Sequence, residues 1–277
     1  MTRLHVLGSG SRGNCCAIEA GGAILLVDAG FSAREIERRA AVAGLDLGGA
    51  VGIALTHEHG DHAQGATRLA RRLGVPLVAS PGTLGALGSA GGIPLSGAAP
   101  RELGPFAVHG AATSHDAAEP LALAVVTEDG TRIGYATDLG RPTTAVRWLF
   151  RELSAVVLEA NYDEVLLRTS DYPPAVQQRI AGFGGHLSNG DAAELLRELH
   201  HPGLSAVVLA HLSQRCNTPD HARERVAAAL ARVGFEGRLE VAGQDEPLPP
   251  LTIVPPGDRP VPLASSRPLG EEDDGDW

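Results

Sequence analysis

The chain alternates short apolar runs with turn residues and helical stretches, a pattern typical of an α/β protein. Two of these runs, residues 14–19 and 23–27, are separated by Gly21 and Gly22 and predict a β-hairpin. We predict further strands wherever an apolar run of strand length is bounded by turn residues: residues 4–7, 50–55, 75–79, 106–108, 121–127, 131–136, 155–158, 206–210, 238–241 and, as an edge strand, 251–254.

Two capping-box sequences predict where helices begin. Ser32 is followed three residues later by Glu35, and Ser188 is followed at the same spacing by Asp191, so we expect one helix after residue 32 and another that runs to Leu199. We also expect a basic helix around residues 68–72, an alanine-rich helix over 219–233 and a loop over 89–100. The arginines of the helix after residue 32 and of the helix around residues 68–72 could contact phosphates, but we interpret them as solvated helix faces.

Length and composition limit the architecture. A chain of 277 residues with 43% apolar composition can bury a substantial core, and we predict one domain over residues 1–255. Residues 256–277 are rich in proline and acidic residues and are predicted to be a disordered tail. The three cysteines are an odd number and two are adjacent, which favours a reducing compartment. Because no secretory signal or membrane-length apolar run is present, we expect a soluble, cytoplasmic protein with no membrane partner.

The charge balance gives no footprint of nucleic-acid binding. The net charge is −10, and five of the acidic residues lie at positions 271–276, so the body of the protein is only mildly acidic. A basic patch or stripe is the usual sign of a nucleic-acid surface. The composition therefore weakens the case for a nuclease without excluding one, because a local groove can be basic on an acidic protein.

The hexapeptide His57–His62 is the strongest chemical signal in the chain. It contains three imidazoles and the carboxylate of Asp61, and it follows an apolar run that ends at Leu55. Such a cluster would be repulsive or idle in a core, whereas a divalent cation would neutralise and order it. If the segment is a tight loop after a strand, His57 and His59 can face one metal ion while Asp61 and His62 turn toward a second.

Two familiar motifs are excluded by the residues themselves. A zinc-protease helix needs His-Glu-x-x-His, but Asp61 occupies the position of the second histidine. Residues 8–13 match the dinucleotide fingerprint G-x-G-x-x-G, yet they lead into the predicted hairpin and not into a helix. Neither a protease helix nor a dinucleotide site is therefore expected.

Later strand ends carry further candidate groups. His109 and His115 compete as an additional imidazole, Asp138 follows the strand 131–136, and His211 follows the strand 206–210. His186 lies just ahead of a predicted helix N-terminus, where an anionic phosphate can bind. The plainer alternatives are an N-cap of the following turn for Asp138 and a buried structural histidine for His186.

Thr56–His62 resembles the HxHxDH signature of the metallo-β-lactamase fold hydrolases. The resemblance implies an αββα sandwich with two mixed β-sheets flanked by helices, and it favours His115 over His109. It also implies that Asp28 braces the site and that Asp138 bridges two metal ions. The implied metal ligands are His57, His59 and His115 on one ion, Asp61, His62 and His211 on the other, and Asp138 between them.

Further motifs sharpen the resemblance to the YycJ/WalJ-type group of this fold. They are the sequences at 7–15, 114–120, 159–163, 185–189 and 210–214, which span most of the chain. The group is described as metal-dependent 5′ to 3′ DNA exonucleases, so the resemblance implies a nucleic-acid substrate, with DNA favoured over RNA. This chain departs from the group's usual residues at Gly60, Tyr162 and Arg215-Cys216, none of which is an implied metal ligand.

The resemblance also implies a mechanism. Hydroxide bridging two divalent metal ions, Zn or Mn with Fe also compatible, would attack phosphorus. Asp61 and Asp138 would hold the ions, and we assign His186 the role of proton donor to the leaving 3′ oxygen. We therefore expect a metallo-hydrolase of phosphodiester bonds whose catalytic residues are Asp61, Asp138 and His186.

Two other functions are compatible with parts of the sequence. A small-molecule hydrolase acting on a thioester, lactone or cyclic phosphodiester would use the same chemistry, and the acidic body favours it. An oxygen-handling di-iron protein of the same fold is disfavoured, because that branch carries a Glu where His59 stands. A basic groove beside Asp138 and His186 would favour the nuclease, and a closed apolar pocket would favour the small-molecule enzyme.

Overall fold

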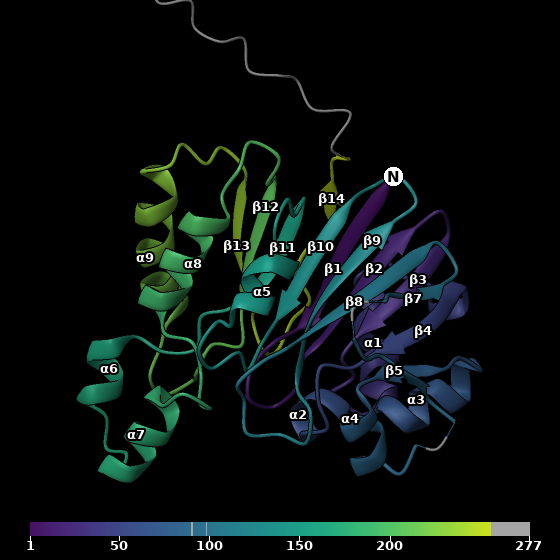
Figure 1. Ribbon diagram of the computed structural model, residues 1–277, viewed down its shortest axis with the longest axis horizontal. Helices are drawn as coiled ribbons and strands as arrows, with labels where there is room; N and C mark the ends of the chain where they lie inside the picture. Colours follow the sequence, from purple (N-terminus) through teal and green to yellow (C-terminus); the bar gives the residue numbers. More distant parts are fainter. Residues whose placement is uncertain (90, 98, 256–277) are drawn as a thin grey trace, which may run out of the picture.

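The protein is a four-layer sandwich in which two β-sheets pack face to face between outer helices (Figure 1). The structure is a computed structural model and describes residues 1–89, 91–97 and 99–255. In spatial order the first sheet contains β14 (Leu251–Ile253), β1 (Thr2–Gly8), β2 (Cys15–Ala20), β3 (Ala23–Val27), β4 (Ala50–Ala54), β5 (Leu77–Ala79) and β6 (Ile93–Pro94). The second contains β13 (Arg238–Val241), β12 (Ala206–Ala210), β11 (Ala155–Glu159), β10 (Arg132–Ala136), β9 (Leu121–Thr127), β8 (Phe106–Ala112) and β7 (Arg101–Leu103).

Both sheets are mixed. In the first sheet β1, β2 and β3 are antiparallel neighbours, whereas β3 to β6 run parallel. In the second sheet β8, β9 and β10 are antiparallel, and β10 to β13 run parallel. The αββα sandwich with two mixed sheets is therefore confirmed.

The side chains of each strand alternate between two cores. Leu25 and Val27 of β3 belong to the core between the sheets, whereas Ile24 and Leu26 face the helices on the other side. Val157 of β11 likewise points between the sheets while its neighbours face outward. Strands that are apolar on both faces are expected where helices cover a sheet, because each face is then buried.

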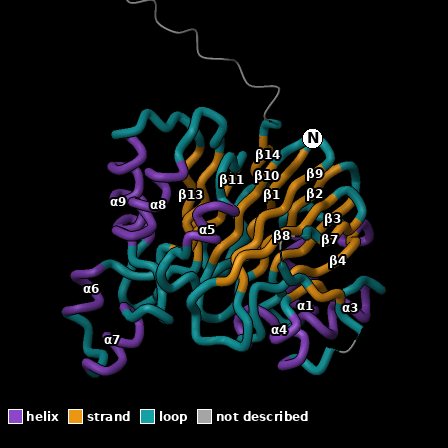
Figure 2. Tube along the Cα trace, viewed as in Figure 1, coloured by secondary structure: helices purple, strands orange, loops and turns teal. Residues whose placement is uncertain are grey.

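Helices cover the outer face of each sheet, as the colouring of Figure 2 shows. The first sheet is covered by α1 (Ala33–Val42), α3 (Ala66–Leu73) and α4 (Pro81–Ala86), and the second by α5 (Thr144–Leu149), α8 (Asn189–Leu199) and α9 (Pro219–Ala231). The short 3₁₀ helix η1 (Leu47–Gly49) precedes β4, and α2 (Gly60–Ala63) follows it. Helices α6 (Glu164–Arg168) and α7 (Pro174–Ala181) lie apart from the sandwich at the lower left of Figure 1.

Both predicted capping boxes begin helices. The hydroxyl of Ser32 accepts a hydrogen bond from the Glu35 amide at 3.2 Å, and that of Ser188 accepts one from the Asp191 amide at 3.0 Å. The predicted loop over 89–100 was wrong in part, because it contains the short strand β6. The hexapeptide is also not entirely a loop, since α2 begins at Gly60.

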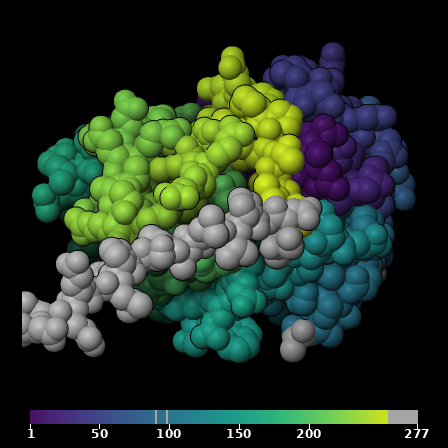
Figure 3. Space-filling view, turned by 90° about the horizontal axis from the view of Figure 1, so that it is seen from above, coloured from purple at the N-terminus to yellow at the C-terminus, as the bar shows by residue number. Residues whose placement is uncertain are grey.

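The C-terminal part of the described chain links the two sheets. The chain leaves β13 at one edge of the second sheet and returns as β14, which pairs antiparallel with β1 of the first sheet. Figure 3 shows this yellow segment at the surface between the green C-terminal helices and the purple N-terminal strands. The predicted edge strand is confirmed, whereas the predicted tail over 256–277 lies outside the described residues, and the domain boundary at 255 stays a prediction.

No helix in the described ranges combines the length and the hydrophobicity that crossing a lipid bilayer requires. The three cysteines are all buried and unpaired.

The turn between β9 and β10 leads to a pH-dependent prediction. The carboxylate of Asp129 accepts hydrogen bonds from the Thr127 hydroxyl at 2.5 Å, from the Thr131 amide at 3.1 Å and from the Thr2 hydroxyl at 3.1 Å. Burial raises the pKa of Asp129, but the hydrogen bonds from Thr127 and Thr131 outweigh it and lower the pKa from 3.8 to about 2. The carboxylate therefore stabilises the fold above about pH 4, and this contribution is lost as the pH falls through about 2.

Asp129→Asn should accordingly lower the free energy of unfolding near neutral pH by about 1 kcal/mol, a value limited by solvent screening at this turn. Urea unfolding at several pH values should show the difference from the native protein shrinking below about pH 4. Glu128→Gln, at the exposed neighbouring position, is the matched control. An equal loss in both variants, or a loss that does not change with pH, would show that the turn carboxylate has no special role.

Candidate metal centre

The predicted ligands lie where strands of both sheets end. His57 follows β4, Asp138 follows β10, His211 follows β12, and His115 lies in the connection between β8 and β9. Asp28, Asp138 and His211 have positive φ angles of 58°, 51° and 54°, in the left-handed region that side-chain-bearing residues rarely adopt. Strained backbone at three strand ends around one site is typical of functional positions.

One cluster contains His57, His59 and His115, whose ligand atoms all lie within 4.8 Å of one another. His59 Nδ1 is 3.4 Å from His115 Nε2. The structure thus brings together the three imidazoles predicted for the first ion. His109 is not among them, because it lies within β8 and faces a separate cavity beside Trp148.

A second cluster contains Asp61, His62, Asp138 and His211. His211 Nε2 lies 3.3 Å from Asp61 Oδ2 and 3.6 Å from Asp138 Oδ2, and His62 Nε2 lies 3.5 Å from Asp61 Oδ2. These are the residues predicted for the second ion together with the predicted bridging carboxylate.

Asp138 lies between the two clusters. Its Oδ2 is 3.9 Å from Nε2 of His57, and its Oδ1 is 3.9 Å from Nε2 of His115, both members of the first cluster. The same Oδ2 is 2.6 Å from Nε2 of His62 in the second cluster. One carboxylate therefore reaches both groups of imidazoles, as a bridging ligand would.

Outer contacts turn the imidazoles toward the centre. Asp28 accepts a hydrogen bond from Nδ1 of His62 at 2.7 Å and another from the Thr56 amide at 2.9 Å. The Gly185 carbonyl oxygen lies 3.2 Å from Nδ1 of His115. With Nδ1 held by an oxygen, Nε2 is left to face the clusters, which is the arrangement that metal-binding histidines adopt. The contacts of Asp28 match the bracing role expected for it.

Two buried polar atoms of the site have no hydrogen-bond partner among the described residues and are suited to binding a cation. His57 Nε2 and Asp138 Oδ2 are buried and have no hydrogen-bond partner within the described structure. Although Asp138 Oδ2 lies close to His62 Nε2, the contact lacks the geometry of a hydrogen bond. Orphaned buried polar atoms are costly, and two of them facing one another at 3.9 Å are best satisfied by a positive charge between them. The donor set of imidazoles and carboxylates suits Zn, Mn or Fe.

The protonation states of His57 and Asp138 suit cation binding. Burial, reinforced by the neighbouring His62, lowers the pKa of His57 to about 2, so this imidazole is neutral near pH 7. Burial would raise the pKa of Asp138, but His211 and His62 outweigh it and hold the pKa well below its usual range. Metal ligands must be neutral imidazoles and ionised carboxylates, so these two groups need release no proton to bind a cation near pH 7.

Glu159 is a functional candidate that the sequence analysis missed. It is fully buried, and it lies with Asp138, His186 and His211 in a third cluster of potential ligands. Its Oε1 lies 2.8 Å from Nδ1 of His186 and 3.2 Å from Nδ1 of His211, and its Oε2 accepts hydrogen bonds from the amides of Leu139 and Leu187. A charged residue directly after the apolar run 155–158 was the available signal.

Glu159→Gln should weaken metal binding about 10- to 100-fold, because the amide cannot accept all four hydrogen bonds and the orientation of His211 is lost. The measurement is a metal titration of the native and variant proteins. Glu236→Gln, at an exposed position, should leave the affinity unchanged. Equal affinity of the native protein and Glu159→Gln would contradict the orienting role.

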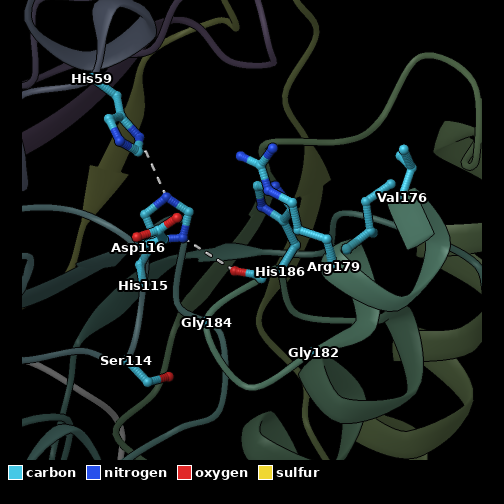
Figure 4. Close-up of a pocket in the computed structure, with 11 residues that line it drawn as sticks. His59, Ser114, His115, Asp116, Val176, Arg179, Gly182, Gly184 and His186 are labelled. Atoms are coloured by element: carbon cyan, nitrogen blue, oxygen red, sulfur yellow. Dashed lines mark hydrogen bonds between the residues drawn. The ribbon is translucent and has the colours of Figure 1, made fainter.

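His186 lies at the wall of a cavity of about 670 Å³ (Figure 4). The cavity is lined on one side by the imidazoles of His59, His115 and His186 and on the other by helix α7. The His186 side chain is 25% exposed, so it is not a fully buried structural histidine. Burial lowers its pKa, but the carboxylates of Glu159 and Asp138 outweigh this effect and raise the pKa to about 10.

The departures from the resembling group lie outside the two clusters predicted to bind the ions. A Cβ at Gly60 would have no atom within 4 Å, so no steric cause requires glycine there. Tyr162 is buried in a small core with Leu167 and Cys216. The guanidinium of Arg215 stacks on the ring of Tyr172 at 4.3 Å and pairs with Asp171. These contacts link the connection between α6 and α7 to the segment that follows β12.

Residues 24–212 match the family model described as the β-lactamase superfamily domain. The chain is 33% identical to exodeoxyribonuclease YycJ of Bacillus anthracis over 237 residues. This match covers 83% of this chain and 89% of that protein. It is 30% identical over 239 residues to exodeoxyribonuclease WalJ of Streptococcus pneumoniae serotype 2, with 83% and 88% covered.

The fold is similar to that of the metallo-β-lactamase fold protein YhfI from Bacillus subtilis. The TM-score is 0.68 at 17% sequence identity, and the match covers 89% of this chain and 98% of that one. At this identity the likeness concerns the fold alone.

Proposed function

Because this chain belongs to the β-lactamase superfamily and to its YycJ/WalJ-type group, we propose that it is a metal-dependent nuclease that removes nucleotides from a DNA end with 5′ to 3′ polarity. It is a hydrolase of the metallo-β-lactamase fold. The observation that carries the proposal is the position of Asp138, whose two oxygens reach the imidazoles of both clusters. Two of the group's members, from Bacillus anthracis and Streptococcus pneumoniae, are named exodeoxyribonucleases, which supports DNA as the substrate.

Seven residues would hold two divalent cations. The first set would be His57, His59 and His115, the second Asp61, His62 and His211, and Asp138 would be shared between them. When bound, such cations supply Lewis acidity, which makes water a nucleophile near neutral pH and offsets the charge of a phosphate. Asp28 and Glu159 orient the imidazoles, so the ligand geometry is set before substrate arrives.

His186 would protonate the leaving oxygen. Its Nδ1 is held by Glu159, and its ring lines the cavity, so a proton on Nε2 can be delivered to a group bound there. Cleavage of a phosphodiester requires this proton because an alkoxide is a poor leaving group. Substrate and water would thus bind at the two clusters, and His186 would donate the proton that lets the leaving group depart.

A small-molecule ester or phosphodiester is the second candidate substrate. The acidic body of the protein favours it, and a cavity of about 670 Å³ has the size of a small-molecule site. The wall of the cavity favours the nuclease instead, because it carries Arg179 opposite the imidazoles and is not closed or mainly apolar.

End-labelled nucleic acids distinguish the two candidates. We would incubate the Mn-loaded protein with DNA and RNA, single-stranded and duplex, labelled at either the 5′ or the 3′ end. Stepwise release from the 5′ end of DNA, absent from an Asp138→Ala preparation, is the expected result. If no nucleic acid is cut by protein that has bound metal, the substrate is a small molecule.

A further inference from the structure

Helix α7 presents one face to the cavity. Val176, Arg179 and Ile180 are spaced at i, i+3 and i+4, so they share a face, and all three line the cavity opposite the imidazoles. Figure 4 shows the Arg179 side chain extending from α7 toward the part of the cavity that contains His186. No residue of this helix is fully buried, so part of each of these three side chains is accessible to a bound molecule.

The helix is nonetheless fixed in place. The Ile180 carbonyl oxygen accepts a hydrogen bond from the His186 amide at 2.9 Å, which joins the end of α7 to the segment carrying the proposed proton donor. Ile180 and Tyr172 also pack against the small core of Tyr162, Leu167 and Cys216. A helix face that is joined to the His186 segment by these contacts is suited to positioning a substrate.

Arg179 has no counter-ion in the described part of the chain. Its guanidinium forms none of the ion pairs or side-chain hydrogen bonds found among the described residues, whereas Arg141 and Arg215 on neighbouring segments are paired with carboxylates. Asp116, the one carboxylate that lines the same cavity, is not paired with it. An unpaired guanidinium facing a cavity is a ready partner for a phosphate, which it can bind through two parallel hydrogen bonds.

We propose that Arg179, Val176 and Ile180 form a nucleotide subsite that binds the unpaired end of a nucleic-acid strand. Arg179 binds a phosphate next to the one being cleaved, and the two aliphatic side chains contact the sugar and base of that nucleotide. A cavity of about 670 Å³ has the size of a site for one nucleotide, so we infer that the terminal nucleotide enters it unpaired. This inference rests on the proposed nuclease function and specifies its substrate as a single-stranded terminus.

Binding measured without cleavage tests the subsite. The probe is a short single-stranded DNA with phosphorothioate linkages and a fluorescent 3′ label, titrated with the metal-loaded protein at several salt concentrations. Arg179→Ala should weaken binding about tenfold and reduce the slope of log affinity against log salt by about one, because one phosphate contact is lost. Arg179→Lys should restore most of the salt slope.

Arg168→Ala is the matched control. Arg168 is also exposed and lies on the neighbouring helix α6, but it does not line the cavity, so its removal should change neither affinity nor slope. Equal effects of the two alanine substitutions, or a blunt duplex bound as tightly as the single strand, would overturn the subsite. Competition by a free mononucleotide as strong as that by the oligonucleotide would do the same, since it would indicate a small-molecule site.

The two failures are distinguishable. If the native protein cuts no nucleic acid, the proposed function is wrong. If it cuts DNA but Arg179→Ala binds the probe as the native protein does, only the subsite is wrong.

Discussion

Replacing Asp138 by alanine is expected to reduce hydrolysis by at least roughly 10³-fold, because metal-derived charge stabilisation is worth several kcal/mol. The carboxylate reaches imidazoles of both clusters, so its loss removes the ligand that the two ions would share. The measurement is the rate of release of labelled nucleotides by the native and variant proteins, each with its metal content determined.

The backbone at Asp138 calls for a second variant. Its φ of 51° is strained for alanine, whereas asparagine adopts this region more readily. Asp138→Asn should therefore retain the native unfolding temperature more closely while still losing most of the activity, since the negative charge is absent. Native turnover in either variant, with the variant's metal content known, would show that no carboxylate bridge is needed.

His186→Ala should slow cleavage of a natural phosphodiester about 10²- to 10³-fold, the usual contribution of a general acid. The reason is the position of the ring, whose Nδ1 is held by Glu159 while the side chain lines the cavity. A substrate whose leaving group is a nitrophenolate needs no proton, so its cleavage should fall much less. Rates for a series of aryl and alkyl phosphodiesters with the native and variant proteins measure this dependence.

A loss of the same size for every leaving group would exclude proton donation and leave His186 a positioning residue. His186→Gln is the matched variant, because it keeps a polar side chain that can donate to Glu159 but cannot supply a titratable proton. The variant should behave as His186→Ala does if the proton matters.

Local signals predicted most of the fold. The capping boxes at Ser32 and Ser188, and the hairpin at Gly21 and Gly22, depend on neighbouring residues and are present in the structure. Helices α6 and α7 were not predicted, because they are short and α7 buries no residue, so no apolar period marks it. The strand β6 has two residues and depends on pairing with β5, which local sequence does not encode.

The proposed metal ligands could be predicted from the sequence, whereas the residues that surround them, Glu159 and Arg179, could not. The seven proposed ligands were found from a specific signature and from their positions at strand ends, and the structure brings them together. Glu159 was missed because its importance comes from two histidines 27 and 52 residues away in sequence, which the fold brings beside it. Arg179 was missed for a similar reason, since nothing in the sequence shows that α7 faces the cavity.

The measurement that tests the two-metal nuclease most directly is a titration of metal-free protein with Mn²⁺, in which bound metal and release of labelled nucleotide from DNA are followed in the same samples. Two ions should bind per chain, and cleavage should appear with the second, because Asp138 links two clusters that act together. Full cleavage with one ion bound, or with none, would exclude a mechanism that needs both metal ions.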